Sequence, residues 1–322
     1  MELNDFLAEW HNDNPRILVH TSGSTGKPKP LMVEKRRMLN SARITCDFLG
    51  LKPGDTALLC MPLDYIAGKM MVVRSLQRDL RLTTVRPSSH PLADDALPSF
   101  TFAAMVPMQV YNTLKVPCER ERLMHIHHLI IGGGAISDEL AQMIKPLPNA
   151  VWSTYGMTET LSHIALRRLN GPDASLWYTP FDGVGISLNA DGCLVIDAPE
   201  VCAEPLVTND IAQLRTDDRT GKTLFRIKGR KDNVVCSGGI KIQIEEVEET
   251  LRPHLSAPFM IVKKQDEMLG EKAILLTESA DLTHIEEICR NTLPKYWVPR
   301  EFLHIDHLPL TETGKPKRSG AF

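Results

Sequence analysis

The sequence predicts an α/β protein: a layered, largely parallel sheet plus a small β unit, followed by a small α+β C-terminal domain. Two observations favour the parallel sheet. Short apolar segments alternate with stretches of helical periodicity, and several apolar segments run directly into loops rich in glycine or hydroxyl groups. The third observation is a change of pattern after about Gly171, where short alternating stretches separated by turn residues are typical of antiparallel strands.

The first half of the chain supplies the elements of the parallel sheet. Residues 17–19 read as a short strand, and a helix that Gly50 ends is expected over 34–48. Ser137 is the predicted N-cap of a later helix. Further strands are expected at 57–61, 82–85, 102–106, 129–131 and 150–154. Loops at the carboxyl ends of such strands share one edge, so the loops 21–27, 132–135 and 154–159 are expected to meet at one crevice.

The second half begins with the small β unit, to which stretches such as 192–196 and 223–227 belong. A polar break at 229–233 follows, and an acidic amphipathic helix begins at Ile244. The acidic run 245–249 is expected to face solvent. We therefore expect a large domain over residues 1–229 and a C-terminal domain over residues 230–322.

Composition excludes several classes of protein. The chain is 43% apolar and 24% charged with a net charge of −3, which gives no reason to expect a nucleic-acid partner. Its seven cysteines are dispersed and lack zinc-site spacing, as reduced thiols of a cytosolic protein do. No apolar run is long enough to span a bilayer, and the acidic N-terminus is unlike a signal peptide. A cytoplasmic protein without a membrane span is expected.

The strongest local signal is a loop of hydroxyls, glycines and lysines after residues 17–19. Such a loop suits a phosphate, because glycines admit backbone N–H groups and lysine supplies charge. It is not a Walker loop, since Gly23 and Gly26 are too close together and Pro28 follows Lys27. A flexible polar surface turn is the alternative. The candidate phosphate ligands are Thr21, Ser22, Gly23, Ser24, Thr25, Gly26 and Lys27.

A second signal is the segment from Ser153 to Thr160. Tyr155 offers a flat apolar partner for a purine, and Glu159 is a hard oxygen donor suited to Mg²⁺. A strand-to-helix turn with an incidental acid is the alternative. The glycine-rich turn at 132–135 is weak evidence alone, because a plain tight turn has the same composition.

In this order the segments resemble the adenylate-forming superfamily of acyl-CoA synthetases, luciferases and peptide-synthetase adenylation domains. The resemblance implies an enzyme that uses ATP, Mg²⁺ and CoA. It implies that Tyr155 packs on adenine, Thr158 meets the α-phosphate and Glu159 holds the metal. The remaining nucleotide-binding residues that it implies in these two segments are Gly133, Gly134, Ala135, Thr154, Gly156 and Met157.

Three later segments extend the resemblance. Thr208-Asn209-Asp210 resembles the family's T-G-D, in which the acid takes the ribose hydroxyls; asparagine tolerates the left-handed backbone of the replaced glycine. The stretch after residue 229 resembles the hinge about which the C-terminal domain rotates between two half-reactions. The implied roles are ribose binding for Arg230, the hinge for Asp232, and the CoA pantetheine tunnel for Gly238 and Gly239.

The last of these segments lies near the C-terminus and resembles T-x-x-G-K. Lys315 is the matching lysine, which would stabilise the negative charge of the adenylation transition state. Lys315, Glu159, Thr158 and Tyr65 are therefore the expected catalytic residues. A basic tail without function is the alternative for the C-terminal segment.

Within the superfamily, the stretches 104–109 and 229–248 resemble the o-succinylbenzoate–CoA ligases of menaquinone biosynthesis, and the usual N-terminal subdomain is expected to be absent. The chain departs from the family where an aromatic residue and His are usual, because Asp64 and Tyr65 stand there. Tyr65 still suits a gate between the acid and thiol sites, and Lys69 is a candidate partner for a second carboxylate. With these two, Gln109 and Ser162 complete the expected acid pocket.

The favoured hypothesis is a two-step ligase that adenylates a carboxylic acid, by preference o-succinylbenzoate, and then forms the CoA thioester. The rivals are a CoA ligase for another aryl or aliphatic acid and an inactive, truncated nucleotide-binding protein. A sheet edge left by the absent subdomain would be a liability, so a partner or a homodimer is plausible.

Overall fold

The structure is a computed structural model that describes residues 1–20, 30–310 and 317–318. Its contacts divide the chain into two compact units. Unit 1 comprises Met1–Ile186, Ile196–Leu206 and Arg215–Phe225. Unit 2 comprises Ser187–Val195, Val207–Leu214 and Arg226–Phe322.

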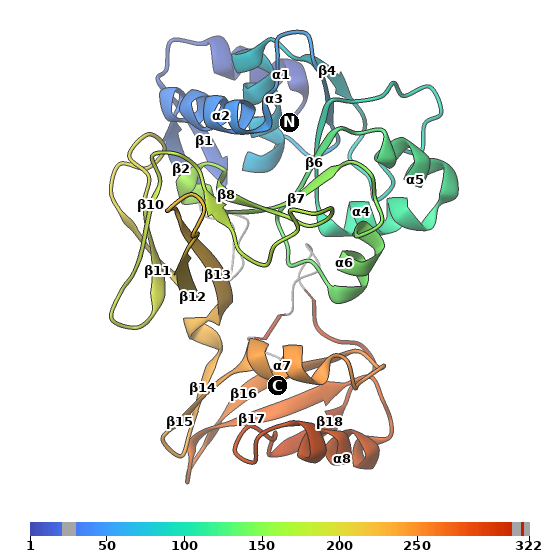
Figure 1. Cartoon of the computed structure of the whole chain (residues 1–322), viewed down its shortest axis with the longest axis vertical. Coiled ribbons are helices and arrows are strands. Elements are labelled where there is room, and N and C mark those ends of the chain that lie inside the picture. The colour runs from blue at the N-terminus through green and yellow to red at the C-terminus, as the bar shows by residue number, and fades with distance from the viewer. Residues whose placement is uncertain (21–29, 311–316, 319–322) are drawn as a thin grey trace. The chain divides into compact units, whose positions relative to one another are not determined.

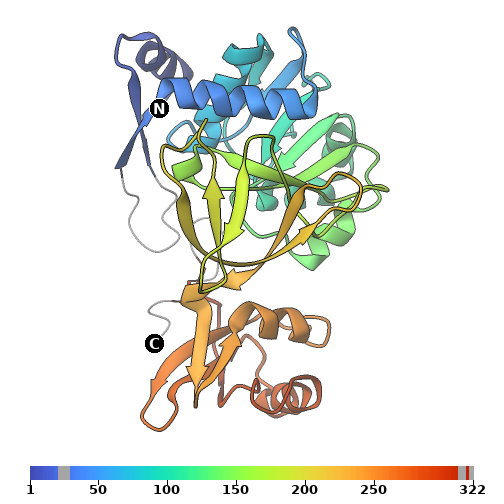
Figure 2. The same cartoon turned by 60° about the vertical axis from the view of Figure 1, so that its left-hand side comes forward.

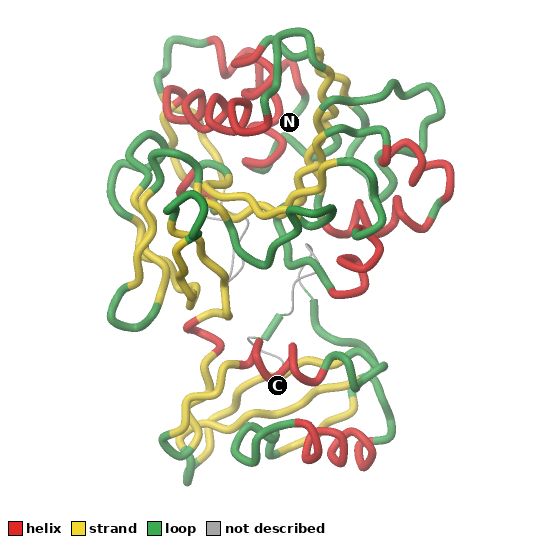
Figure 3. The backbone as a smooth tube through the Cα atoms, in the orientation of Figure 1, coloured by secondary structure: helices red, strands yellow, loops and turns green. Residues whose placement is uncertain are grey.

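Unit 1 is built on a seven-stranded sheet (Figure 3). The strands run in the order β4-β3-β5-β6-β7-β8-β9, and the first five are parallel. β8 and β9 continue the sheet antiparallel, so the predicted largely parallel sheet is confirmed with an antiparallel edge. The strands are β3 (Thr56–Leu59), β4 (Arg81–Thr84), β5 (Phe102–Met105), β6 (His128–Ile131), β7 (Ala150–Gly156), β8 (His163–Arg168) and β9 (Thr179–Pro180).

Burial explains why the central strands read as unbroken apolar runs. All four residues of β5 are buried, and so are three of the four residues of β6. Parallel strands are covered on both faces, and each residue of such a strand therefore meets apolar neighbours.

Helices flank the sheet of unit 1. Figures 1 and 2 show α1, α2 and α3 together on one side of this unit and α4, α5 and α6 together on another. Gly50 ends α2 with φ 67°, and the Ser137 hydroxyl accepts a 3.2 Å hydrogen bond from Leu140 N at the start of α6, both as predicted. The helices are α1 (Leu3–His11), α2 (Lys35–Leu49), α3 (Ile66–Arg78), α4 (Pro107–Lys115), α5 (Pro117–Met124) and α6 (Asp138–Ile144).

One expected strand lies elsewhere. β1 (Arg16–His20) pairs antiparallel with β2 (Pro30–Glu34) in a separate two-stranded sheet. The expectation that the loop 21–27 joins a strand of the parallel sheet directly to a helix is therefore wrong. The alternation of residues 30–34 places Val33 opposite Ile17 in the core, so this stretch forms a strand before α2 begins.

The small β unit predicted after Gly171 is confirmed. Consecutive strands are neighbours in a four-stranded sheet, β10-β11-β12-β13, which Figure 2 displays. Residues on either side of the unit boundaries contribute to these strands. The strands are β10 (Gly185–Leu188), β11 (Cys193–Asp197), β12 (Leu206–Thr216) and β13 (Thr223–Arg230).

The C-terminal part of unit 2 is an α+β layer, as predicted. Its sheet has the order β15-β14-β17-β16, and β18 pairs parallel with β17. α7 (Ile244–Leu251) and α8 (Leu282–Thr292) share one apolar core with residues of β14, β15, β16 and β17. The strands are β14 (Val234–Ser237), β15 (Ile240–Gln243), β16 (Phe259–Asp266), β17 (Gly270–Thr277) and β18 (Glu301–His304).

The acidic run of α7 does not simply face solvent. Glu248 is buried, and its Oε2 lies 2.6 Å from Arg318 Nη2. Its other carboxylate oxygen accepts a 2.7 Å hydrogen bond from Ile261 N. Burial raises the pKa of this carboxyl, while Arg318 opposes the rise. The expectation of a solvated helix face is therefore wrong for Glu248, because the tertiary fold supplies it with a cation.

Among the residues that the structure describes, no helix is both long enough and apolar enough to cross a membrane.

Candidate functional site

Two of the predicted nucleotide segments meet at the carboxyl edge of the parallel sheet. β6 and β7 are parallel neighbours with Ile131 opposite Ser153, so the segments that follow leave from the same edge. A Cβ at Gly132 would lie 2.5 Å from Thr154 Oγ1, which shows how closely they approach. Gly133 has φ 79°, a conformation that favours glycine. Local geometry therefore favours glycine at both positions.

The ring of Tyr155 belongs to a cluster of three aromatic side chains in unit 1. It meets Phe225 edge-on with centroids 5.0 Å apart and lies 5.7 Å from Tyr178. Tyr178 stacks on Phe225, and its hydroxyl lies 2.9 Å from Ser153 Oγ. The cluster holds the ring of Tyr155 by packing, which gives the kind of rigid apolar surface that a purine stacks on. Its contact with adenine stays a prediction.

Gly156 is the last residue of β7, and the returning chain at Ser162 and His163 packs directly against it. A Cβ there would lie 2.2 Å from Ser162 O and 2.4 Å from His163 Cα, so only glycine fits. The short 3₁₀ helix Thr158–Thr160 follows. It buries the side chain of Thr158 and exposes Glu159.

The donor set around Glu159 fits the Mg²⁺ ion that accompanies ATP. Magnesium is commonly bound through one or two carboxylates together with phosphate oxygens and water. The exposed carboxylate of Glu159 provides one such oxygen donor, beside the predicted nucleotide segments. Within the described ranges no group of three or more His, Cys, Asp and Glu side chains could hold a metal by itself. The metal would therefore depend on the nucleotide for most of its ligands.

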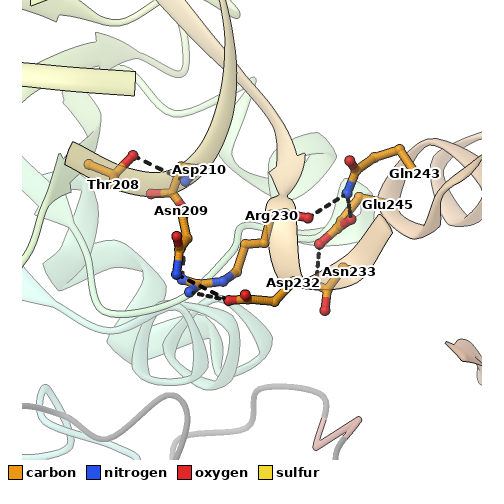
Figure 4. Close-up of polar contacts among 8 residues, drawn as sticks. All are labelled: Thr208, Asn209, Asp210, Arg230, Asp232, Asn233, Gln243 and Glu245. Atoms are coloured by element: carbon orange, nitrogen blue, oxygen red, sulfur yellow. Dashed lines mark hydrogen bonds and ion pairs between the residues drawn. The ribbon is translucent and has the colours of Figure 1, made fainter. Parts of the chain in front are cut away.

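A second group of predicted residues lies together within unit 2 (Figure 4). Arg230 Nη1 is 3.6 Å from Asp210 Oδ1, and Arg230 Nη2 is 3.1 Å from Asp232 Oδ2. One guanidinium thus links the predicted ribose ligand to the predicted hinge residue. Thr208 Oγ1 accepts a 3.1 Å hydrogen bond from Asp210 N, which fixes the backbone at the carboxylate.

Asn209 does not adopt the backbone that the sequence comparison suggested. It lies within β12, and the left-handed residues other than glycine in the described chain are Asp79 and Leu161. The expectation of a left-handed Asn209 is therefore wrong, because strand pairing keeps this residue extended. Its side chain instead donates a 3.4 Å hydrogen bond to Asp232 Oδ2 (Figure 4).

The segment beyond Arg230 is fixed by local contacts. Gln243 Nε2 donates to Arg230 O at 3.0 Å, and both Gln243 and Asn233 donate to the carboxylate of Glu245. Gly238 and Gly239 form the two-residue turn between β14 and β15, both at positive φ, as a type I′ turn requires. The turn alone accounts for these two glycines, and their contact with CoA stays a prediction.

Several predicted residues lie outside the described part of the chain. They are Thr21, Ser22, Gly23, Ser24, Thr25, Gly26, Lys27 and Lys315. Met157 and Ala135 are described, next to Thr158 and Gly134 respectively.

The residues predicted for the acid pocket are not equally available to a ligand. Tyr65 is partly exposed as the residue that precedes α3. Lys69 is buried, and its ammonium donates a 2.8 Å hydrogen bond to Leu18 O; burial lowers its pKa. Gln109 is buried too, with its amide bonded to Cys60 O, Ser88 O and Val106 N. Ser162 Oγ accepts a 2.6 Å hydrogen bond from Arg74 Nη2.

Arg74 is the residue that sequence reasoning missed. It is 2% exposed in α3, and its Nε has no hydrogen-bond partner among the described residues. Burial lowers the pKa of its guanidinium to about 10, so the group is still charged at neutral pH. A buried cation that lacks a carboxylate is uncommon and costly. A signal did exist, because an arginine follows the apolar run 70–73 on the buried side of a helix.

Two surface hollows of about 400 and 440 Å³ lie along α2 rather than at these residues. Both border Glu200, and residues of α2 such as Arg37 and Phe48 line one or the other. We place the site at the strand ends instead, because the close approach of Gly132 to Thr154 and the packed Tyr155 ring lie there.

Comparison with known proteins agrees with this architecture. A family model described as AMP-binding enzyme matches residues 4–203. An acyl-CoA synthetase (AMP-forming)/AMP-acid ligase II-like protein from Dyadobacter fermentans is 34% identical, with a TM-score of 0.68, over 98% of this chain and 91% of that one. The O-succinylbenzoate coenzyme A synthetase of Bacillus subtilis, solved with ATP and a magnesium ion, has a TM-score of 0.73 at 23% identity over 94% of this chain and 69% of that one.

Among curated proteins, a 2-succinylbenzoate–CoA ligase from Bacillus mycoides is 25% identical over 95% of this chain. The chain spans 69% of that relative's length. The family model covers well over half of this chain, and its matched range contains the Gly132–Ala135 and Thr154–Glu159 segments that meet at the sheet edge. The chain belongs to the AMP-binding enzyme family of the adenylate-forming superfamily, among its AMP-forming acid–CoA ligases.

Proposed function

We propose that this protein is an ATP-dependent acid–CoA ligase and that its acid is o-succinylbenzoate. The observation that supports the reaction is the contact between the glycine-rich turn at Gly132 and the Tyr155 segment at Thr154. A nucleotide bound at this edge would have the ring of Tyr155 beside its base and Glu159 within reach of a phosphate-bound Mg²⁺.

The proposed reaction has two steps. In the first, a carboxylate oxygen of the acid attacks the α-phosphorus of ATP, the bond to the β-phosphate breaks, and an acyl-adenylate and pyrophosphate form. In the second, the CoA sulfur attacks the acyl carbon, a C–S bond forms, and AMP leaves with the electrons of the broken C–O bond. Thr158 and Lys315 would stabilise the charge that grows in the first step.

Asp210 and Arg230 are the proposed ribose ligands. The carboxylate of Asp210 can accept hydrogen bonds from two ribose hydroxyls, and Arg230, which already contacts Asp210, would lie beside them. We further propose that residues 230–322 rotate against residues 1–229 about Asp232 between the steps. The rotation would remove Lys315 from the reacting groups after adenylation and bring the turn at Gly238 and Gly239 to the CoA thiol.

The choice of acid rests on charge. o-Succinylbenzoate has two carboxylates, and only one of them is activated. The second needs a cation in the acid pocket. The ammonium of Lys69, our expectation from sequence, is bonded to Leu18 O, whereas Arg74 is bonded to Ser162, another residue expected in the acid pocket, and its Nε has no partner in the described chain. Arg74 therefore replaces Lys69 as the proposed carboxylate partner, with Ser162 beside it.

Pyrophosphate release tests this proposal. Purified protein is incubated with ATP, Mg²⁺ and either o-succinylbenzoate, a benzoate or a fatty acid, with and without CoA. Release with o-succinylbenzoate, and AMP formation that depends on CoA, would support the proposal. Release with a monocarboxylic acid alone would retain the ligase and reject the acid. Silence across the panel with ATP still bound would favour a nucleotide-binding protein without ligase activity.

The variant Lys315→Ala separates binding from catalysis. It should lower adenylation by about 10²–10³-fold, as loss of a group that stabilises transition-state charge does. Its affinity for ATP should stay close to that of the unchanged protein. Lys317→Ala is the matched control, because it removes a neighbouring lysine from the same segment. Equal losses in both variants would contradict a specific role for Lys315.

A further inference from the structure

A chain of hydrogen bonds connects Arg74 to the interior of unit 1 through neutral side chains. Arg74 Nη2 donates to Ser162 Oγ at 2.6 Å, Ser162 Oγ lies 3.1 Å from His163 Nδ1, and His163 Nε2 lies 3.1 Å from Thr45 Oγ1. Arg74, His163 and Thr45 are all buried. We refer to Arg74, Ser162, His163 and Thr45 as the Arg74 relay.

The direction of each hydrogen bond in the relay follows from counting protons. The hydroxyl of Thr45 is 3.1 Å from Ser41 O and can donate its single proton there, which leaves its oxygen to accept from His163 Nε2–H. His163 Nδ1 then accepts from the hydroxyl of Ser162, and Ser162 Oγ accepts from Arg74. The reverse order would leave the Ser162 hydroxyl proton without an acceptor among the described residues.

The backbone is arranged to present Ser162 and His163 together. Leu161, which precedes them, has φ 66° and ψ −34° although it is a bulky residue with a buried side chain. Such a conformation is unfavourable for a residue other than glycine and is often found at functional sites. The next two residues cross directly over Gly156. The backbone is thus strained at Leu161, directly before the two relay residues Ser162 and His163.

A neutral relay suits a cation that must bind an anion. A carboxylate beside Arg74 would orient it but would also neutralise it, and a second anion would gain little. Neutral serine, histidine and threonine orient the guanidinium without using its charge. His163 remains neutral because burial, and the nearby Arg74 cation, hold its pKa well below the usual value.

We propose that His163 and Thr45 are positioning residues for substrate recognition: through Ser162 they fix the orientation of the Arg74 guanidinium, whose Nε–H has no partner in the described chain and is left for the anionic group of the acid. The hydroxyl of Ser162 is committed to His163, and it therefore acts on the acid only through Arg74. This inference rests on the proposed function for its kinetic readout, whereas its structural readout is independent of activity.

Two matched pairs of variants test the relay by kinetics. In His163→Asn the amide oxygen replaces Nδ1 as the acceptor for Ser162, while His163→Gln places its amide nearer the Nε2 position and loses that acceptor. Thr45→Ser keeps the acceptor for Nε2–H, and Thr45→Val removes it. We expect His163→Gln and Thr45→Val to raise KM for the acid about tenfold, the loss of one hydrogen bond, with little change in kcat or in KM for ATP. Equal KM values within either pair would overturn the proposal.

Side-chain ¹⁵N NMR tests the same relay without any substrate. In the unchanged protein His163 should be neutral with its proton on Nε2, and the Arg74 guanidinium, assigned with Arg74→Lys, should give slowly exchanging N–H signals. These Arg74 signals should persist in His163→Asn and be lost in His163→Gln. A proton on Nδ1, or Arg74 signals unchanged in both variants, would overturn the relay even if no acid releases pyrophosphate. If the NMR results support the relay but no acid in the panel releases pyrophosphate, only the proposed function is rejected.

Discussion

Replacement of Arg74 by methionine should stabilise the fold and weaken acid binding at the same time. Methionine keeps the length of the buried side chain and removes its charge. Burial lowers the pKa of Arg74 from 12.5 to about 10, which corresponds to about 3 kcal/mol against the charged form. Apolar replacement of buried charges of similar volume often stabilises proteins by about 1–4 kcal/mol. We therefore expect Arg74→Met to raise the free energy of unfolding by about 1–2 kcal/mol.

The effect on the acid should have the opposite sign. Loss of charge-assisted hydrogen bonds to a substrate carboxylate costs about 3 kcal/mol, which is on the order of a 100-fold rise in KM for o-succinylbenzoate. KM for ATP should not change, because none of the predicted nucleotide residues lies in α3. Urea unfolding measures the stability, and pyrophosphate release with each substrate varied in turn measures the two KM values.

Arg168→Met is the matched control. The Arg168 guanidinium bonds to Asn170 and lies 5.1 Å above the ring of Trp152, so this arginine has structural partners. Its replacement should lower stability and leave KM for the acid unchanged. The reasoning about Arg74 would be refuted if Arg74→Met lost more than about 2 kcal/mol of stability while KM for the acid stayed the same, since that is the behaviour of a structural arginine.

Three further predictions concern packing and charge. Gly156→Ala should lower the free energy of unfolding, measured in urea, by about 3 kcal/mol, because its Cβ would lie 2.2 Å from a backbone atom. Gly185→Ala is the control: its Cβ would have its nearest neighbour at 3.4 Å, and it should lower this free energy by less than about 1 kcal/mol. Equal losses would contradict the steric argument. Burial depresses the pKa of His163, so the contribution of this neutral side chain to the free energy of unfolding is fully present above about pH 6.5 and falls by up to about 1.4 kcal/mol per pH unit below it. The free energy of unfolding of His163→Asn should therefore depend less on acid. Parallel pH profiles for the two proteins would disprove this. Arg318→Met should cost about 3 kcal/mol by leaving Glu248 buried without its cation, and adding Glu248→Gln should recover most of that loss; additive losses in the double variant would show that the pair is not coupled.

The sequence alone determined the elements whose signal is local. Apolar runs predicted the strands of the parallel sheet, and Gly50 and Ser137 marked helix ends correctly because capping depends on a few adjacent residues. That the loops after β6 and β7 leave from the same edge of the sheet was also predictable, since parallel strands place their carboxyl ends at one edge.

Tertiary structure decided what depends on partners distant in the chain. β1 left the parallel sheet because Val33 opposes Ile17 across a hairpin, and Glu248 is buried because Arg318 reaches it from the C-terminal segment. Lys69 and Gln109 looked suited to a ligand, but the fold commits their polar atoms to backbone groups. Arg74 belongs to no sequence motif, and only the fold shows why it is unusual. Burial removes water from its charge, and the relay that orients it supplies no carboxylate.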